Sequence, residues 1–320
     1  MMSWPDFKYK QIIVHRVLNR GEKLRFRADN IVILDADDKV VVQHSCHRLF
    51  ALFIIGELSM TSVLMRNAVK FGFPIILMNT NLKIISRINC AAEGNTTLRK
   101  YQYGCEERRL QIAKLLIRGK INNQIQLLKD LRRLADGDKV ALDYLQGLNI
   151  ELAQDSYELM GLEGCASKMF FSAYFRPLGW KRREPRCKRD IYNLLMDIGY
   201  TYLFQFIEAM LSLYGFDLYC GVLHTFFYQR KSLVCDIVEP FRCIIDRRIR
   251  KAYNLDQIDE KDFAFSNGAY SLGWDKQEKY TRLFMKDILT RKEEIFKFCH
   301  TYYRWFMRGG QGVAFPVFNI

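Results

Sequence analysis

The sequence lacks the features that would assign it to a membrane, to export or to a structural zinc site. Its longest apolar run, Leu49–Ile55, is far shorter than the roughly 18 residues that a membrane-spanning helix needs. The segment Met1–Asp6 has neither the basic nor the apolar region of a secretory signal. The nine cysteines form no CxxC pair, and free thiols are typical of a reducing compartment. We therefore expect a cytoplasmic protein without structural zinc.

Acidic residues are too few to balance the basic ones. Lysine and arginine number 49 against 35 aspartates and glutamates, which gives a net charge of +14 and a pI near 9.3. Such a balance favours an anionic polymer as partner, with nucleic acid ahead of a membrane surface. A basic excess also serves solubility alone, so charge by itself decides little. With 49% hydrophobic and 14% aromatic residues, the chain has enough apolar surface to form a core.

The first part of the chain has a pattern typical of strands. Residues 1–90 hold short β-branched and aromatic runs separated by turn residues, which predicts a small β-rich domain. Within it, helical spacing over Thr61–Phe71 predicts one helix, with Gly72 placed to end it. A polar stretch at 91–104 predicts a linker.

The second part of the chain has the periodicity of helices. Residues 105–308 repeat apolar side chains at three- and four-residue steps, which predicts an all-α domain and an α+β fold for the whole chain. The longest pattern is expected to break once, at Gly147 or Gly161, and the glycine-containing tail at 309–320 is expected to be loose. The predicted helices are Glu106–Arg118, Ile121–Leu134, Lys139–Phe175, Asp190–Tyr214, Ser232–Arg250 and Lys276–Phe306.

Glu163 lies on the apolar stripe of its own predicted helix. Leu159, Ala166 and Phe170 flank it at helical steps of −4, +3 and +7. A carboxylate on such a face is costly to desolvate unless it is paired or binds a cation. Taken alone, the better interpretation is a buried glutamate that an arginine neutralises.

Two further segments carry ligand-type side chains among apolar neighbours. His224, taken alone, is typical of a core histidine. Asp236 and Glu239 are three residues apart, which places both carboxylates on one face of a predicted helix. Like charges on one face repel, and a divalent cation would relieve this repulsion. Oxygen ligands with one imidazole favour Mg²⁺ or Mn²⁺ over zinc or copper, and Pro240 is expected to bend the helix beside the site.

Three motifs, in this order, resemble those of one known family. They are Gly161-Leu162-Glu163-Gly164, then Gly215-Phe216-Asp217 leading to Gly221-Val222-Leu223-His224, then Ser232-Leu233-x-x-Asp236-Ile237-x-Glu239-Pro240-Phe241-Arg242. With them the chain resembles, over nearly its whole length, the universal CRISPR-associated integrase, the Cas-one family. In that family a β-rich N-terminal domain precedes a helical catalytic domain. A weaker family-like segment is Lys120-Ile121-Asn122-Asn123-Gln124.

The resemblance implies a site, a reaction and an assembly. It makes Glu163, His224 and Glu239 the ligands of Mg²⁺ or Mn²⁺, with Asp236 as a nearby acidic support. The implied reaction is attack of a DNA 3′-hydroxyl on a phosphodiester of a CRISPR repeat, and water in place of that hydroxyl gives endonuclease action. Dimerisation through the N-terminal domain and assembly of two dimers with a Cas-two dimer are implied as well. One departure is Asp190-Ile191-Tyr192-Asn193, where family members often have Asp-Pro-x-Asn, and it is expected to alter only a helix start.

Two basic groups follow the metal-ligand motifs in sequence and are candidates for DNA contacts. Solvated surface charge is the alternative for each of them. Trp180 and Tyr192 are candidates for stacking on an unpaired base, although such aromatics more often belong to a core. The basic candidates are Arg176, Lys181, Arg182, Arg183, Arg186, Lys188, Arg189, Arg242, Arg247 and Arg248.

Two other functions use the same residues. A metal-dependent DNA repair nuclease without an integration role would have the same ligands and the same basic surface. A non-catalytic nucleic-acid scaffold would need only the basic surface, and it predicts that Glu163→Ala leaves every DNA-processing activity intact.

Overall fold

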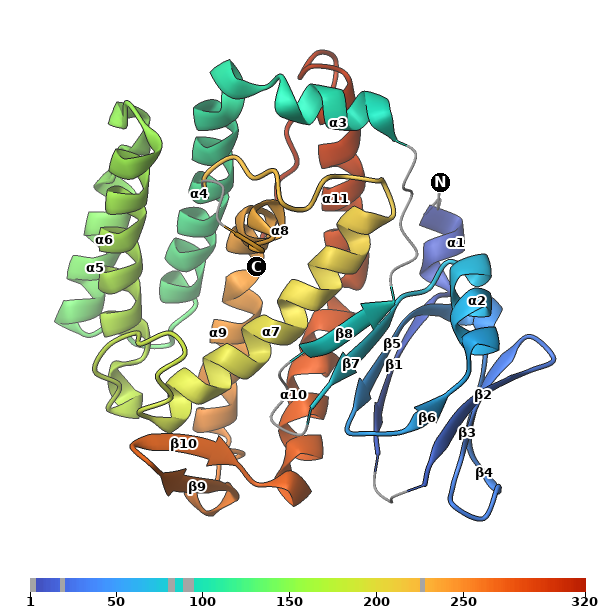
Figure 1. Cartoon of the computed structure of the whole chain (residues 1–320). Helices are drawn as coiled ribbons and strands as arrows, with labels where there is room; N and C mark the ends of the chain where they lie inside the picture. The colour runs from blue at the N-terminus through green and yellow to red at the C-terminus, as the bar shows by residue number, and fades with distance from the viewer. Residues whose placement is uncertain (1–3, 18–20, 80–83, 89–94, 225–227) are drawn as a thin grey trace. The chain divides into compact units, whose positions relative to one another are not determined.

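The chain divides into two units, residues 1–95 with 212–215 and residues 96–211 with 216–320. The computed structural model describes residues 4–17, 21–79, 84–88, 95–224 and 228–320 (Figure 1). Strands predominate in the first unit and helices in the second, so the predicted α+β fold is confirmed. Among the described residues, every helix is too short or too polar to cross a membrane.

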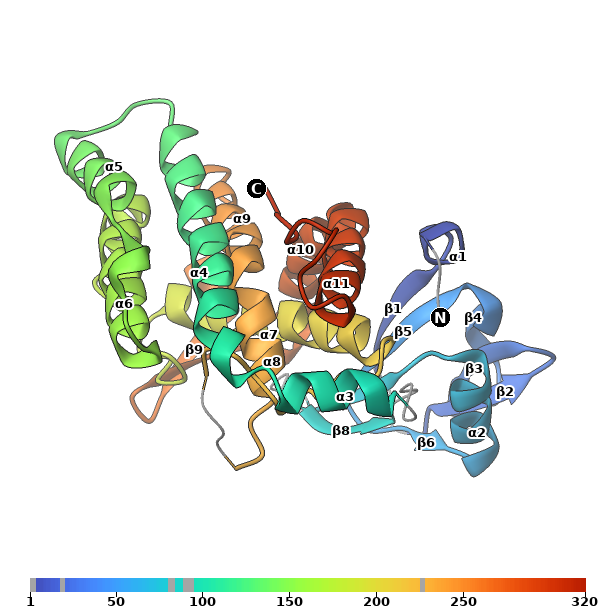
Figure 2. The same ribbon diagram turned by 90° about the horizontal axis from the view of Figure 1, so that it is seen from above.

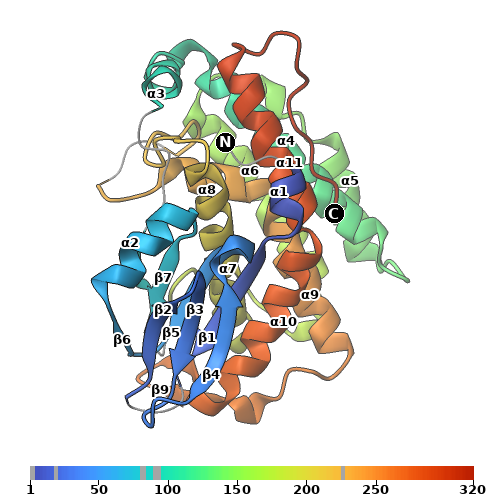
Figure 3. The same cartoon turned by 90° about the vertical axis from the view of Figure 1, so that its right-hand side faces the viewer.

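The described part of the first unit contains two four-stranded sheets, a short helix α1 (Trp4–Lys8) and a longer helix α2 (Ser62–Phe71). One sheet has the order β1-β5-β7-β8 and the other β4-β3-β2-β6. Figure 3 shows β2, β3 and β4 side by side, as their antiparallel pairing requires. The strands are β1 (Gln11–Arg16), β2 (Lys23–Arg27), β3 (Asn30–Leu34), β4 (Val40–Ser45), β5 (Leu49–Ile55), β6 (Ser59–Met60), β7 (Ile75–Met78) and β8 (Ile84–Ile88).

Strand β5 is the apolar centre of its sheet. All seven of its residues are buried, and it pairs in parallel with β1 on one side and β7 on the other. A continuous apolar run is the pattern expected of a parallel strand that is covered on both faces. The longest apolar run of the sequence is therefore a core strand.

Helix α2 (Ser62–Phe71) confirms the helix predicted in this half of the chain. The Thr61 hydroxyl accepts a hydrogen bond from the amide of Leu64, which satisfies one of the free donors at the helix start. Gly72 ends the helix in the left-handed region, with φ 71°. Leu64 and Ala68 are buried in the apolar core of the first unit.

Helices form most of the second unit. Figures 1 and 2 show α4, α5 and α6 side by side, and contacts between α4 and α6 and between α5 and α6 agree with this view. The helices are α3 (Thr96–Tyr103), α4 (Glu106–Lys129), α5 (Asp136–Gly147), α6 (Ser156–Tyr174), α7 (Ile191–Ser212), α8 (Ser232–Val238), α9 (Arg242–Asn254), α10 (Gln277–Thr290) and α11 (Lys292–Met307).

Helix α4 joins two helices that the sequence pattern separated. The chain stays helical through Gly119, although glycine weakens a helix interior. Helix α4 packs at this point against the Glu239–Phe241 turn, and a Cβ at position 119 would make an ordinary contact of 3.6 Å with the ring of Pro240. Tertiary packing here outweighs local propensity.

The other breaks occur at identifiable residues. Helix α5 ends at Gly147, whereas Gly161 lies inside α6, so Gly147 is the correct one of the two predicted break points. The bend predicted at Pro240 is present as a 3-10 turn, Glu239–Phe241, between α8 and α9. The pattern over 276–306 also divides, and α10 and α11 meet at Arg291.

Two features of the second unit correct the sequence predictions. An antiparallel hairpin, β9 (Phe263–Ser266) and β10 (Ala269–Leu272), interrupts the predicted all-α composition. The hairpin turns at Asn267 and Gly268, both with positive φ, a pair of residues that favours tight turns. The stretch predicted as a linker, 91–104, contains α3, and its residues 91–94 lie outside the described part of the chain.

The C-terminal tail is packed rather than loose. Phe318 is buried, and its ring centroid lies 4.6 Å from that of Phe241. The Asn123 amide donates to the Phe318 carbonyl at 2.9 Å and accepts from the Ile320 amide at 2.9 Å. The prediction for 309–320 was wrong because glycine content does not reveal that a later aromatic side chain enters the core.

Candidate active site

Glu163 projects from the middle of α6. The helix begins at an aspartate cap, where Asp155 accepts a hydrogen bond from the Glu158 amide. Leu159 and Ala166, one turn to either side, are fully buried, whereas the Glu163 side chain is 23% exposed. Its carboxylate therefore lies at the edge of the apolar core, where it remains accessible to a ligand. The Ser167 hydroxyl donates to Glu163 Oε1 at 2.7 Å.

Lys120 of α4 joins two of the predicted metal ligands. Its buried ammonium donates to Glu163 Oε1 and, at 2.7 Å, to Glu239 Oε2. Burial alone would lower the pKa of Lys120, but Glu239 and Glu163 outweigh burial and raise it, so the side chain is a cation. Sequence reasoning noted this lysine only as part of a family-like segment. The sequence held one sign of its role: Lys120 lies on an otherwise apolar face of its helix, four residues after Leu116 and three after Ile117.

Glu239 stands on the 3-10 turn between α8 and α9, and its side chain is almost fully buried. Arg242 donates to Glu239 Oε1 through Nε at 2.9 Å and Nη2 at 2.8 Å, while Lys120 holds Oε2. Burial raises the pKa of this carboxyl, but Arg242 and Lys120 outweigh burial and hold the pKa well below its ordinary value. The group is therefore a carboxylate at every pH at which the protein would be studied.

Asp236 points away from Glu239, toward the chain segment that carries His224. It is fully buried and accepts hydrogen bonds from the backbone amides of Val222, Leu223 and His224 at 2.6 to 3.1 Å. Asp236 and Glu239, expected to repel each other, are thus stabilised by different partners. The reason is that the helix ends at the turn between them, and three amides already satisfy Asp236.

Asp236 also orients the ring of His224. Nδ1 of the imidazole lies 2.6 Å from Asp236 Oδ1, an arrangement that places a proton on Nδ1 and leaves Nε2 for another partner. Gly221 makes this approach possible, because a Cβ there would lie 2.7 Å from Asp236 Oδ2. Asp236 is therefore a positioning residue for His224 and lies outside the set of groups that face a ligand.

One cavity of about 700 Å³ brings the separate motifs together. Glu163, His224 and Glu239 all line it, although they come from three segments remote in sequence. Among the described residues, no three acidic, histidine or cysteine side chains lie close enough to hold a metal ion in the present arrangement. The Lys120 ammonium lies between the two carboxylates and bonds to both. The carboxylates of Glu163 and Glu239, which now share the Lys120 ammonium, and the oriented imidazole of His224 line one cavity. Two carboxylates and one imidazole are a donor set that fits Mg²⁺ or Mn²⁺.

A buried chain of contacts extends behind Glu239. Arg242 lies over the ring of Tyr200, with its guanidinium carbon 4.7 Å from the ring centroid. The Tyr200 hydroxyl donates to Asp246 at 2.5 Å. Burial raises the pKa of Asp246 to about 7, and Tyr200 together with nearby cations opposes this rise only in part. The support of Glu239 therefore includes a carboxyl that titrates near neutral pH.

The predicted DNA-contact residues occupy different environments. Lys181, Arg182 and Arg183 line the active-site cavity, and Lys181 and Arg182 are exposed. Arg242 is not free for DNA in this structure, because it donates two hydrogen bonds to Glu239. Arg186 is exposed, and Lys188 and Arg247 are half-buried.

Ion pairs occupy several of the other basic side chains. Arg183 bonds to Asp197 at 2.5 Å, Arg176 bonds to Asp138 at 2.7 Å, and Arg182 and Arg189 both lie near Glu184. Arg248 corrects the prediction: it is 8% exposed and makes two 2.7 Å bonds to Asp287, so it is a core ion pair. Arg248 lies on the buried face of α9, and the sequence did not reveal this because its neighbours in the chain are also basic.

The two aromatic candidates for stacking are separated. Trp180 lines the active-site cavity, where it packs 5.4 Å from Phe171 between ring centroids. Tyr192 instead packs against Tyr253, and it does not line that cavity. At the departure from the family pattern, Asp190 accepts a hydrogen bond from the Asn193 amide at 2.8 Å at the start of α7. The helix start is thus maintained without a proline.

Comparison with known proteins assigns the chain to a family. The model of the family described as CRISPR associated protein Cas1 matches residues 16–286. A CRISPR-associated endonuclease Cas1 of Thermodesulfovibrio yellowstonii is 30% identical over 66% of this chain and 70% of its own length. One from Chlorobaculum tepidum is 28% identical over 82% of each chain.

Solved structures share the fold over nearly the whole chain. A CAS1 protein from Thermotoga maritima superposes with a TM-score of 0.81 at 19% identity, and the match covers 95% of this chain and 99% of that one. A Cas6-RT-Cas1–Cas2 complex gives 0.82 at 20% identity, over 97% of this chain and 36% of that one. A casposase bound to integration product gives 0.77 at 17% identity, over 96% and 93%. Glu163, His224 and Glu239, which line the active-site cavity, all lie within residues 16–286, the range that the family model matches. The chain belongs to the CRISPR associated protein Cas1 family.

Proposed function

We propose that this protein is a DNA endonuclease and integrase that joins the 3′-hydroxyl end of a short DNA to a phosphodiester of a CRISPR repeat. The observation that carries the proposal is the convergence of Glu163, His224 and Glu239 on one cavity with exposed cations at its wall. The family relatives are named as endonucleases, and a structural relative is a casposase bound to integration product. Both names support DNA strand cleavage and transfer.

A divalent cation, Mg²⁺ or Mn²⁺, is part of the proposal. Glu163 and Glu239 would hold it through their carboxylates and His224 through Nε2, once the Lys120 ammonium moves from between the two glutamates. Such a cation, when bound, polarises a phosphate and stabilises the leaving oxygen of the phosphodiester. Arg242 keeps Glu239 ionised and fixed in direction, so this glutamate needs no reorganisation to act as a ligand.

The chain's own residues account for binding and orientation of the DNA. Lys181 and Arg182 are exposed at the cavity, where they suit two successive phosphates of a DNA strand. Trp180, which also lines the cavity, offers an aromatic ring on which an unpaired base would stack. The nucleophile is the 3′-hydroxyl of the incoming strand in integration and water in endonuclease action. Asp236 holds the His224 ring in one direction throughout.

The assembly is also proposed. Insertion of a fragment into both strands requires two active sites, which a homodimer supplies. A solved relative is part of a complex that contains Cas2, and this supports a Cas2 dimer as partner of the present chain.

A plasmid assay tests the proposal. The protein is incubated with Mn²⁺, a short duplex with 3′-hydroxyl ends and a supercoiled plasmid that carries a CRISPR repeat. The proposal predicts covalently joined products for the wild type and loss of joining in Glu163→Gln, with DNA binding kept. Glu278→Gln is the matched control, because Glu278 is an exposed carboxylate of α10 outside the cavity.

Each outcome of this assay has a defined meaning. Nicked but unjoined plasmid in the wild type would indicate a repair nuclease and contradict the integrase assignment. Equal activity of Glu163→Gln and the wild type would contradict the active site itself. A Glu163→Gln protein that unfolds more readily is replaced by Glu163→Asp, which keeps the charge and shortens its reach.

A further inference from the structure

A second cavity lies between α3 and the C-terminal end of α11, with a volume of about 560 Å³. It shares no lining residue with the cavity of Glu163. Its volume is within the range of roughly 300–1,000 Å³ that is typical of small-molecule sites. Neither the family motifs nor the proposed reaction uses the residues that line it.

The charge of this cavity has a single sign. Lys100, Arg108 and Arg308 line it, and no aspartate or glutamate does. In the part of the chain that the structure describes, none of these three cations forms an ion pair with a carboxylate. Three uncompensated positive charges around one hollow favour an anionic ligand.

Arg108 is held in place before any ligand arrives. Its guanidinium lies over the ring of Trp305, 4.8 Å from the centroid. Gly309 and Gly310, with φ of 61° and 83°, turn the chain back against it. The positive φ of Gly310 favours glycine, and a Cβ there would lie 2.7 Å from Arg108 Nη2, at the flexible end of that side chain, and 3.3 Å from the Trp305 ring. A guanidinium fixed in this way loses little conformational entropy when it binds a phosphate.

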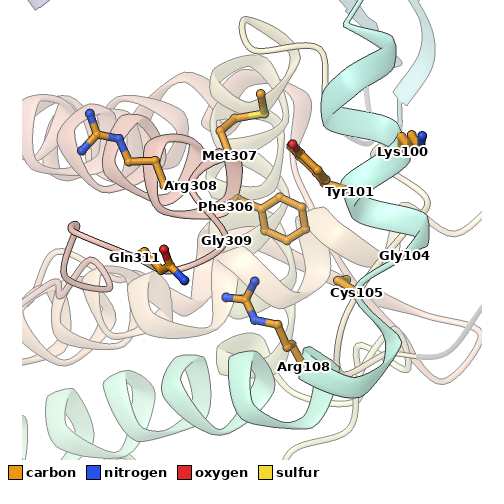
Figure 4. A pocket seen from close by; sticks show the side chains of 10 residues that line it. All are labelled: Lys100, Tyr101, Gly104, Cys105, Arg108, Phe306, Met307, Arg308, Gly309 and Gln311. Atoms are coloured by element: carbon orange, nitrogen blue, oxygen red, sulfur yellow. The ribbon is translucent and has the colours of Figure 1, made fainter.

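Aromatic rings lie next to the cations. Figure 4 shows Tyr101, Phe306 and Arg108 extending toward the same space, with Lys100 and Arg308 at its two sides. Tyr101 is 48% exposed, so its ring is available to a ligand. A fixed arginine beside one accessible aromatic ring, Tyr101, matches the two parts of a nucleotide, because the phosphate suits the arginine and the base stacks on the ring.

We propose that this cavity binds a nucleotide, with its phosphate on Arg108 and its base against Tyr101. Lys100 and Arg308, at the rim, add long-range attraction for the phosphate. The nucleotide is either free or part of a single DNA strand, since both present the same chemistry. The site is separate from the reaction at Glu163, and it does not depend on the proposed function.

Calorimetric titration of the full chain tests the site. The probes are deoxyadenosine 5′-monophosphate, deoxyadenosine without phosphate, a 5′-phosphorylated tetrathymidylate and a tetraglutamate peptide. Arg108→Leu is expected to weaken nucleotide binding about tenfold or more, because it removes a charge-assisted bond to phosphate. Arg108→Lys keeps the charge but loses the fork, and should bind with intermediate affinity.

Controls separate this cavity from the rest of the basic surface. Arg132→Leu removes one exposed arginine beyond the end of α4 and is expected to leave affinity unchanged. Lys181→Ala with Arg182→Ala removes cations of the Glu163 cavity and should spare the monophosphate site. Lys100→Ala with Arg308→Ala changes only exposed side chains, so it tests the proposal even if Arg108→Leu fails to fold.

The possible results divide clearly. Binding of the monophosphate that depends on Arg108 supports a free nucleotide, and binding of only the tetranucleotide with the same dependence supports a DNA strand. Equal binding of deoxyadenosine and its monophosphate would overturn the phosphate assignment. Binding of the acidic peptide alone would overturn the proposal in favour of a protein partner. Affinity that is unchanged in both the Arg108 and the Lys100/Arg308 variants would also refute it.

Discussion

Replacement of Lys120 by methionine tests the arrangement at the active site. The substitution keeps the length and apolar part of the side chain but removes the ammonium that bonds to Glu163 and Glu239. Two carboxylates would then face each other across the space that the ammonium filled. We expect the metal-free variant to be less stable than the wild type, and we expect a divalent cation to restore more stability to the variant than it adds to the wild type.

The magnitude follows from the burial of the three groups. Removal of one partner from a fully buried ion pair costs about 3–5 kcal/mol. Here the loss is smaller, because Glu163 is 23% exposed and Glu239 keeps both bonds from Arg242. We therefore expect a loss of about 2–3 kcal/mol in the free energy of unfolding without metal.

Urea unfolding with and without Mn²⁺ measures both effects. In the wild type, the cation must displace the Lys120 ammonium, whereas in the variant the carboxylates are free to bind it. The added stability from Mn²⁺ should therefore exceed that of the wild type by about 1 kcal/mol or more, which corresponds to roughly fivefold tighter binding. Lys231→Met is the matched control, because Lys231 pairs with the buried Glu208 outside the cavity.

The control defines the result that would refute the reasoning. Lys231→Met should lose stability without any extra gain from Mn²⁺. If the gains from Mn²⁺ are equal in the wild type and in Lys120→Met, Lys120 does not compete with a cation for these carboxylates. If Lys120→Met is as stable as the wild type without metal, the buried ion pairs are not formed in solution.

Two further substitutions test the groups behind the site. Asp236→Asn replaces one of two oxygens, each of which takes two hydrogen bonds, by an amide donor that faces other donors. We expect a stability loss of about 1–3 kcal/mol and at least a tenfold loss of DNA joining, measured by urea unfolding and the plasmid assay. A variant with unchanged joining would show that the direction of His224 is unimportant. In the folded protein the pKa of Asp246 is raised to about 7, whereas in the unfolded chain this carboxyl loses its proton at lower pH. The free energy of unfolding should therefore fall by about 1 kcal/mol per pH unit as the pH rises from 5 to 7. Asp246→Asn should remove this slope; an identical pH profile in both proteins would mean that Asp246 is not protonated near neutral pH.

Much of the fold was readable from local patterns. The buried run Leu49–Ile55 is a core strand, and the capped, amphipathic stretch ending at Gly72 is a helix, because each depends on side-chain periodicity and on residues next to it in the chain. The motifs around Glu163, His224 and Glu239 identified three segments that the structure brings to one cavity. Their roles as metal ligands stay a prediction.

Other features depended on contacts between distant residues. The continuity of α4 through Gly119 follows from its packing against Pro240, and the order of the tail follows from Phe318 against Phe241. Neither contact can be predicted from the residues next to it in the sequence. Likewise, the pairing of Arg248 with Asp287 could not be separated from the basic surface, because residues on one helix differ in exposure only once their neighbours are placed.

The sequence by itself determined which side chains of this protein are able to hold a cation, since carboxylates among apolar neighbours are costly unless they are paired. Only the tertiary structure decided what pairs them. It placed Lys120 between Glu163 and Glu239, and it turned Asp236 toward the backbone amides of residues 222–224. The physical reason is that spacing along a helix predicts which residues share a face only while the helix continues. Because α8 ends and a turn begins at Glu239, the two carboxylates at 236 and 239 point toward different partners.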